Sequence, residues 1–409
     1  MRSGHLSDYF RQVAWKRLTA VDADQHRSHQ HEFGGVGALR TMLGEEDRRN
    51  IPTTFIYLAD DDPEPLREQA WLSWYDTRRK QSHRGPEYRL YFPDTVVSDN
   101  ATEGDLLIIG VRPDDSLMAI IAESGSTIAG QLLWLFGVDH AHPGYSVKGE
   151  IETNQLRLEF ASRFILEELG VDVESADDDY LDQMNKRFGS SFPGTREFSN
   201  YTRETLGDLD IKGDPDGALM ALVEREEVLF RTFERHLIGD QLQEGFDEVD
   251  EFVRFSLSVQ NRRKKRMGTA LENHLEYMFQ ELGIRADRNP VTEGKSKPDF
   301  IFPGITEYHD PAFETQRLTM LGVKSTCKDR WRQVLSEADR IPDKHLLTLE
   351  PSISLAQTDE MRRQRLQLVL PSRLHLTYAQ SQQSWLLSIS TLVELLHDRD
   401  SIARSSSIE

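Results

Sequence analysis

The sequence lacks the features that mark disulfide-stabilised, zinc-binding or membrane-spanning proteins. It contains one cysteine, Cys327, so no internal disulfide can form, and no CxxC pair or Cys/His array indicates a structural zinc site. No uninterrupted apolar run approaches the length that crosses a bilayer, and the first residues, MRSGHLSDYF, lack the apolar core of a signal peptide. We therefore expect a soluble, cytoplasmic protein with no membrane partner.

An excess of positive charge is also missing. The net charge of -20 argues at first against a nucleic-acid partner, because phosphate binding normally needs an excess of Lys and Arg. The acid is concentrated at 171–183 and 240–252, however, whereas 77–80, 261–266 and 327–332 are locally basic. Binding depends on the local field, so these patches permit a nucleic-acid partner. Each of them alone is more often a solvated face.

A chain of 409 residues with 38% hydrophobic and 29% charged residues is expected to fold as two domains. We place a first domain at 1–175, an acidic, flexible linker at 176–213 and a second domain at 214–409. The linker is assigned because its sequence is rich in Gly, Ser, Pro, Asn and Thr and has little periodicity.

The first domain is predicted to be mainly β. Short apolar or alternating runs bounded by turn residues predict strands at 53–60, 88–94, 105–112 and 116–123, followed by helices at 125–138 and 154–170.

The second domain is predicted to be α/β, with a small central sheet. Apolar residues recur at helical spacing in 217–239, 246–260 and 271–283, ahead of strands at 298–304, 317–326, 344–350 and 366–371 and a helix at 329–340.

Four residues of the second domain form a pattern typical of phosphodiester hydrolysis. This reaction needs a hard cation, carboxylates to hold it and a positive charge near the phosphorane. Asp299 opens one predicted strand, Lys324 lies near the end of the next, Glu337 lies on the following predicted helix, and Glu272 lies on an earlier one. Each signal alone has a commoner structural explanation, such as a turn or a solvated surface residue. The spacing therefore does not decide whether this is a site.

The segments around these residues resemble the catalytic domain of EcoRII-type restriction endonucleases. The similarity runs in order over most of 246–376 and includes the string CKDRWRQ at 327–333. It implies a PD-(D/E)XK nuclease fold in which the second acid has moved from the strand to the next helix, since Gly322 stands where the ordinary motif has an acid. The resemblance implies Asp299 and Glu337 as Mg²⁺ ligands, Lys324 as the phosphate and water partner, and Glu272 as an auxiliary catalytic acid.

The resemblance also implies that Lys328, Asp329 and Arg330 read C·G pairs, as in CCWGG-type palindromic targets. The chemistry fits, because Lys or Arg can donate to guanine O6 and N7 while Asp can accept from cytosine N4. A purely structural alternative is that Asp329 caps the helix 329–340 and its neighbours are solvated. Cys327 is interpreted as a core residue.

The first domain more distantly resembles the effector domain of the same family, a DNA-binding pseudobarrel that is also found in plant transcription factors. The segments that carry this similarity are 15–24, 86–93, 104–110 and 120–137. The residues implied as DNA contacts are Lys16, Arg17, Glu87 and Arg89.

The resemblance as a whole implies a type II, type IIE-like, site-specific deoxyribonuclease. It would cut double-stranded DNA as a homodimer, bind a second copy of the target through its effector domain, and have a cognate DNA methyltransferase as its genetic partner. The alternative is a sequence-specific DNA-binding regulator whose nuclease-like domain no longer cuts. The intact Asp299, Lys324 and Glu337 favour the nuclease.

Overall fold

The computed structural model divides into two compact units. One comprises Ser3–Glu174 together with Ser352–Ala356, and the other comprises Ser175–Pro351 together with Gln357–Glu409. The structure describes residues 6, 9–23, 31–34, 36–60, 65–80, 83–138, 144–148, 162, 165–166, 169–170, 180–327 and 330–405, with side chains as far as 400.

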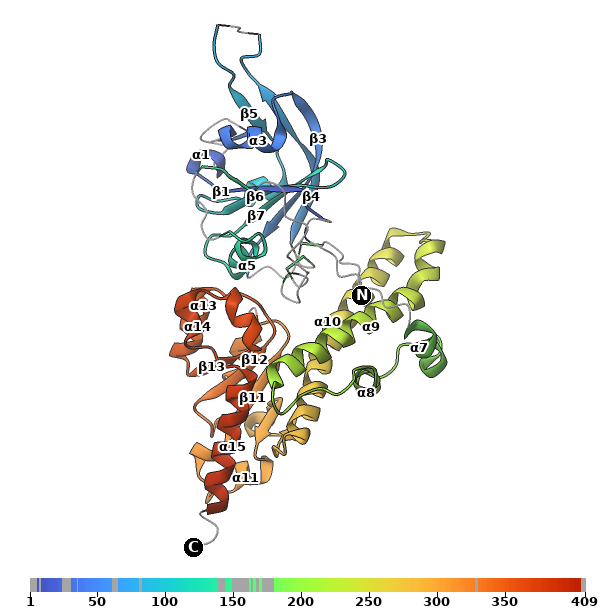
Figure 1. The fold of residues 1–409 in the computed structure, drawn as a ribbon, viewed down its shortest axis with the longest axis vertical. Helices are drawn as coiled ribbons and strands as arrows, with labels where there is room; N and C mark the ends of the chain where they lie inside the picture. Colours follow the sequence, from blue (N-terminus) through green and yellow to red (C-terminus); the bar gives the residue numbers. More distant parts are fainter. Residues whose placement is uncertain are drawn as a thin grey trace. The chain divides into compact units, whose positions relative to one another are not determined.

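The N-terminal unit is built around an eight-stranded, largely antiparallel sheet (Figure 1). Its elements are β1 (Gln12–Arg17), α1 (Ala20–Ala23), β2 (Glu32–Phe33), η2 (Val36–Leu39), α3 (Arg40–Leu43), β3 (Arg48–Leu58), β4 (Leu66–Asp76), β5 (Tyr88–Tyr91), α4 (Val96–Asn100), β6 (Leu106–Val111), β7 (Leu117–Ala122), α5 (Thr127–Leu135) and β8 (Ser146–Lys148). The strand order is β2-β5-β4-β3-β7-β6-β1-β8, and only the β3–β7 pair is parallel among these described strands.

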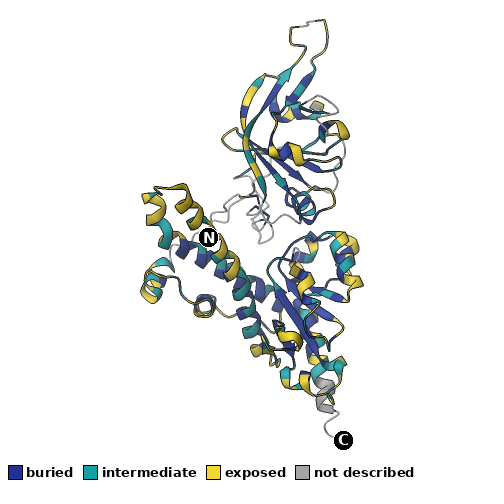
Figure 2. Ribbon diagram, turned by 180° about the vertical axis from the view of Figure 1, so that it is seen from behind, coloured by how far each residue is buried: buried dark blue, intermediate teal, exposed yellow. Residues whose placement is uncertain are grey.

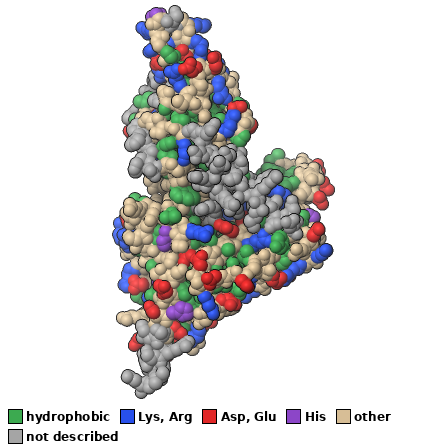
Figure 3. Space-filling view, viewed as in Figure 1, with side chains coloured by type: hydrophobic (Ala, Val, Ile, Leu, Met, Phe, Trp, Pro, Cys, Tyr) green, Lys and Arg blue, Asp and Glu red, His purple; other side chains and the backbone are tan. Residues whose placement is uncertain are grey.

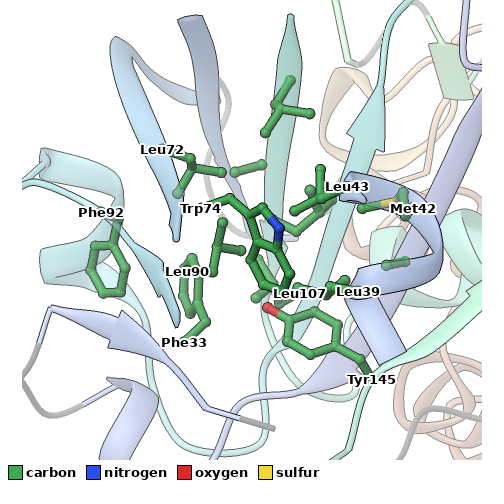
Figure 4. Close-up of a cluster of buried hydrophobic side chains, with 14 of the residues drawn as sticks. Phe33, Leu39, Met42, Leu43, Leu72, Trp74, Leu90, Phe92, Leu107 and Tyr145 are labelled. Atoms are coloured by element: carbon green, nitrogen blue, oxygen red, sulfur yellow. The ribbon is translucent and has the colours of Figure 1, made fainter. Parts of the chain in front are cut away.

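Two hydrophobic cores lie on opposite faces of this sheet. Successive side chains of a strand point to opposite faces, so in β6 Leu107 and Ile109 enter one core while Leu106 and Ile108 enter the other. The first core surrounds Trp74, as Figure 4 shows. The second core is covered by α5. Burial on both faces explains why β6 and β7 are continuously apolar in sequence.

The C-terminal unit combines a five-stranded mixed sheet with a helical subregion. Its elements are α7 (Leu181–Phe188), α8 (Thr195–Thr205), α9 (Pro215–Glu244), α10 (Val249–Glu281), β9 (Asp287–Arg288), η4 (Glu293–Lys295), β10 (Phe300–Phe302), α11 (Ile305–His309), η5 (Thr315–Arg317), β11 (Thr319–Lys324), α12 (Trp331–Val334), β12 (Lys344–Thr348), α13 (Leu355–Arg363), β13 (Leu366–Val369), η7 (Ser372–Thr377), α14 (Gln380–Gln383) and α15 (Ile389–Ser405).

The sheet order β13-β12-β11-β10-β9 places the beginning of β10 beside the end of β11, because these two strands are antiparallel. β11, β12 and β13 run parallel. Figure 2 shows the strands of this sheet in the dark blue of buried residues, whereas the tip of the hairpin formed by α9 and α10 is exposed. The predicted division into a mainly β and an α/β domain is confirmed.

The prediction of a flexible linker at 176–213 is wrong for the described residues from 180 onward. The helices α7 and α8 form there, and their side chains pack with α9 in a buried aromatic cluster. Phe198 and Phe233 are fully buried in this cluster, and the ring of Phe188 contacts both. Aromatic side chains supply the apolar contacts of this segment, and its low periodicity did not reveal them.

Two predicted helix boundaries are also corrected. The segments 246–260 and 271–283 belong to one continuous helix, α10, which runs through the basic stretch 261–266. The helix expected at 329–340 is limited in the described residues to α12, Trp331–Val334, because the chain turns after it and Ala338 has a φ of 51°. Most of the helix expected at 154–170 lies outside the described residues.

Candidate active site

Asp299 and Lys324 meet where β10 begins and β11 ends. The Lys324 ammonium lies 2.8 Å from Oδ2 of Asp299, and the backbone N–H of Val323 donates to the same oxygen at 2.6 Å. The backbone carbonyl of Asp299 accepts from the N–H of Asn289, which fixes the strand on its other side. Both side chains are mostly buried, so the geometry joins a carboxylate and an ammonium in one preformed pair.

Glu337 lies close enough to this pair to interact with it electrostatically. It is not on a helix but in the turn after α12. Burial raises the pKa of Glu337 to about 7, the positive charge of Lys324 opposes this shift, and the negative charge of Asp299 adds to it. Its Oε2 atom is buried and has no hydrogen-bond partner among the residues that the structure describes. An unpartnered, buried carboxylate oxygen is a costly group that a bound cation would satisfy.

The packing around Gly322 explains why an acid is absent from β11. A Cβ atom at this position would lie 2.9 Å from Cγ2 and 3.0 Å from Cγ1 of Val334, on α12. Contacts this close leave no room for a carboxylate. Glu337 is the acid outside β11 that lies near enough to interact with Asp299 and Lys324.

The available donors fit a hard divalent cation. Asp299 and Glu337 offer carboxylate oxygens, which Mg²⁺ prefers, and one of these oxygens has no partner. The described residues contain no group of three or more His, Cys, Asp or Glu side chains that could hold a metal ion. A site with two carboxylates remains suitable, because Mg²⁺ usually keeps several waters and binds substrate phosphate.

Glu272 forms an ion pair with Arg288 of β9. Its Oε2 atom accepts from Nε and Nη2 of Arg288 at 3.2 and 2.8 Å, and Arg288 also contacts Glu276 and Asn273. Within the described part of the chain Glu272 does not join Asp299 and Glu337 in a three-acid group. In the sequence, Glu272 stood out as an acid beside an apolar helical stripe. This position is explained equally well by its ion pair with Arg288 of β9 as by a catalytic role.

The segment after Lys324 is described only in part. Lys328 and Asp329 lie outside the described residues, and so does the proposed cap by Asp329. Arg330 is exposed and precedes α12, and its N–H donates to the Cys327 carbonyl at 2.8 Å. Cys327 is fully buried, and burial raises the pKa of its thiol well above the ordinary value, which agrees with a core residue.

Lys16 does not have the environment expected of a DNA contact. It is 1% exposed, and its ammonium donates to Oδ2 of Asp22 at 2.7 Å and to the Gly34 carbonyl at 2.9 Å. The ammonium also lies over the ring of Tyr145. These partners occupy the charge inside the unit, so the expectation that Lys16 contacts DNA is wrong in this structure. The sequence pattern could not reveal its partners.

The other three expected contacts are at least partly exposed. Arg17 donates to the Gly104 carbonyl at 3.2 Å, and burial lowers its pKa, against the effect of Asp105. Glu87 and Arg89 form an ion pair with each other, and Arg89 also pairs with Glu32 at 3.0 Å. These groups are accessible at the surface, where a phosphate or a base could replace the protein partners.

Two cations near Glu337 were not identified from the sequence. Lys344 opens β12 and donates to the carbonyls of Ala338 and Ile341, which follow Glu337 in the chain. Arg340 contacts the end of α11. Lys344 and His345 open the strand KHLLT, and nothing in this sequence indicates that Lys344 binds backbone carbonyls.

Comparison with known proteins identifies relatives of the C-terminal unit. Residues 230–393 match the family model described as EcoRII C terminal. The chain is 43% identical over 196 residues to the type II restriction enzyme EcoRII of Escherichia coli. The aligned region spans 48% of this chain and 47% of that enzyme, so the chain covers about half the length of the curated relative. The resemblance seen in the sequence is confirmed.

Similarity to solved structures is weaker. A complex of metal-depleted Ecl18kI with uncleaved DNA has a TM-score of 0.45 and 18% identity, covering 54% of this chain and 84% of that chain. A complex of the restriction endonuclease PspGI with substrate DNA has a TM-score of 0.41 and 15% identity, covering 51% of this chain and 93% of that chain.

The surface has no dominant basic face in the view of Figure 3, where acidic and basic side chains are interspersed. Among the described residues, no helix has the length and apolar character needed to cross a membrane.

We predict that Gly322→Asp does not restore the ordinary motif. The added side chain would collide with Val334, so the substitution should lower the free energy of unfolding by about 1–3 kcal/mol. Chemical denaturation measures this directly. A Gly322→Asp protein as stable as wild type would show that the contact with α12 does not restrict position 322.

We also predict a pH-dependent effect of Glu337→Gln on stability in EDTA. Because the folded-state pKa of Glu337 is raised to about 7, its contribution to stability is present at low pH and is lost as the pH rises through 7. At pH 8.5 the variant should therefore be more stable than wild type, by about 1 kcal/mol once solvent screening of this partly exposed group is allowed for. At pH 4 the two should match. An equal difference at both pH values would contradict the raised pKa.

Proposed function

We propose that this chain is a Mg²⁺-dependent, site-specific deoxyribonuclease whose active site consists of Asp299, Lys324 and Glu337. The observation that carries the proposal is the convergence of a carboxylate–ammonium pair with a second carboxylate that has an unpartnered buried oxygen. These residues fall within 230–393, the region that matches the EcoRII C-terminal family model. Relatedness to a type II restriction enzyme supports the same chemistry.

The roles follow from the position of each group. Asp299 and Glu337 would hold Mg²⁺ through carboxylate oxygens. When bound, Mg²⁺ supplies polarisation of the phosphate and activation of water. Lys324 keeps its ammonium 2.8 Å from Asp299, where it can donate to a phosphate oxygen and stabilise the negative charge that develops there. Glu272 is paired with Arg288, so we assign it no direct metal contact.

We further propose that the target is a short palindrome of the CCWGG type, read in part by Lys328, Asp329 and Arg330. The support is the exposed position of Arg330 a few residues after Lys324, which allows base contacts close to the cleaved phosphate. A palindromic site suits a homodimer, because the two-fold axis of the DNA then coincides with that of the protein.

The N-terminal unit is proposed to bind a second, effector copy of the target. The accessible Arg17, Glu87 and Arg89 support this assignment, whereas the buried Lys16 takes no part in it. An enzyme that cuts a short site would also cut the DNA of its own cell. A cognate DNA methyltransferase that protects the same site is therefore the expected genetic partner.

Cleavage of a plasmid that carries CCWGG sites tests the proposal. Wild-type protein with Mg²⁺ should produce discrete fragments, and EDTA should prevent them. Lys324→Ala and Glu337→Gln should each reduce the single-turnover rate by about 10²–10³-fold or more, because each removes a group that acts on the transition state. DNA binding measured without Mg²⁺ should be retained.

The matched control is the Glu394→Gln variant, because Glu394 is an exposed residue of α15. This variant should cleave DNA at the wild-type rate. Wild-type protein that binds this DNA but leaves it intact at every Mg²⁺ concentration would support the DNA-binding regulator instead. Protein that neither binds nor cuts would refute both functions.

A further inference from the structure

The turn that carries Glu337 is not fixed by regular secondary structure. Its helix, α12, ends at Val334, the Glu337 N–H donates to the Val334 carbonyl at 3.2 Å, and Ala338 has a positive φ of 51°. An acid at position 322 would instead lie on a central strand, held by β10 on one side and β12 on the other. Moving the acid into a turn removes that support, although a metal ligand must be held precisely.

Arg340 ties one end of this turn to the segment that follows β10. Its Nη1 atom donates to the carbonyls of Glu307 at 3.2 Å and Asp310 at 2.8 Å and to that of Tyr308, and its Nη2 atom donates to the carbonyl of Phe313. The backbone N–H of Arg340 also donates to the Tyr308 hydroxyl at 3.3 Å. One guanidinium thus links four backbone carbonyls and anchors the turn to α11.

Lys344 holds the same turn from the side of β12. Its ammonium donates to the carbonyl of Ala338 at 3.2 Å and to that of Ile341 at 2.8 Å. Ala338 is the residue next to Glu337, and its carbonyl also accepts from the backbone N–H of Ile341 at 2.9 Å. Lys344 is 6% exposed, which is unusual for a charged side chain.

Neither cation has an ordinary acidic partner. Among the described residues no carboxylate lies within ion-pair distance of Arg340 or Lys344, and their partners are backbone carbonyls. The carboxylates of Asp339, Glu337 and Glu293 are nevertheless near enough to interact with the charge of Lys344, so opposite charge surrounds it without a direct ion pair.

We infer that Arg340 and Lys344 are positioning residues that hold the Glu337 turn for metal binding, in place of the strand that holds the acid in the ordinary motif. The inference rests on the proposed function. Each residue acts through Glu337 and need not touch DNA or the cation.

Metal affinity is the quantity that separates positioning from general stability. The protein is first bound to a target duplex whose scissile phosphate is replaced by a phosphorothioate, so that the DNA is not cut. Mn²⁺ is then titrated into this complex, and the concentration of free Mn²⁺ is measured by electron paramagnetic resonance. Lys344→Met and Arg340→Met should weaken Mn²⁺ binding by about 10–100-fold, the usual effect of losing a group that orients a metal ligand. DNA affinity without metal should stay unchanged.

The matched control is Arg365→Met. Arg365 precedes β13, and its guanidinium forms an exposed ion pair with Asp343, at 2.8 Å, without contacting the Glu337 turn. The Arg365→Met variant should bind Mn²⁺ with the affinity of wild type. Arg340→Lys adds a milder test, because an ammonium cannot reach all four carbonyls, and its Mn²⁺ affinity should fall between those of wild type and Arg340→Met.

The outcomes are distinct. If wild type binds Mn²⁺ and the folded Arg340 and Lys344 variants bind it equally well, the inference is wrong while the proposed function stands. If Lys344→Met does not fold, the Mn²⁺ affinities of the Arg340→Lys and Arg340→Met variants decide whether the inference is right. If wild type itself binds no Mn²⁺ in the DNA complex, the proposed metal site is wrong, and this inference is wrong with it.

Discussion

The contact between Gly322 and Val334 constrains the whole candidate site. α12 packs so closely on β11 that even a Cβ atom at position 322 would be crowded, and a carboxylate cannot be accommodated. The strand therefore carries Lys324 but has no room for a second acid. In the proposed site this acid is Glu337, which lies in the turn after α12, near Asp299 and Lys324. Dense packing at position 322 is thus the constraint on which the proposed arrangement depends.

The N-terminal unit follows a different physical rule. Its sheet buries both faces of β6 and β7, so these two strands present no exposed side chains, and charged residues lie on other elements. Lys16 satisfies its charge inside the unit by pairing with Asp22, whereas Arg89 and Glu87 pair at the surface. A charged residue in a strand can therefore be paired inside the unit, as Lys16 is, or remain partly accessible at the surface, as Arg89 is.

Much of the fold could be predicted from residue patterns. β6 and β7 are continuous apolar runs, and the predictions for them are confirmed. β4 was missed because it begins with LREQ, which includes three charged or polar residues, so the buried Leu72 and Trp74 further along do not stand out as an apolar run. The helices α7 and α8 were missed because their stability comes from aromatic contacts with α9, which are distant in sequence.

The candidate site was only partly predictable. Asp299 and Lys324 are brought together because β10 and β11 are neighbours, a pairing that two adjacent strands made reasonable. Glu337 was expected on a helix, but the positive φ of Ala338 ends helical geometry there. Arg340 and Lys344 could not be predicted, because a cation that binds backbone carbonyls leaves no charge pattern in the sequence.

The most direct measurement is the location of bound metal by anomalous diffraction from crystals of the chain with target DNA and Mn²⁺. The account predicts an anomalous peak bridging the carboxylates of Asp299 and Glu337, next to a DNA phosphate and the Lys324 ammonium. A well-ordered complex with Mn²⁺ bound elsewhere, or with Glu337 turned away from the metal, would contradict it.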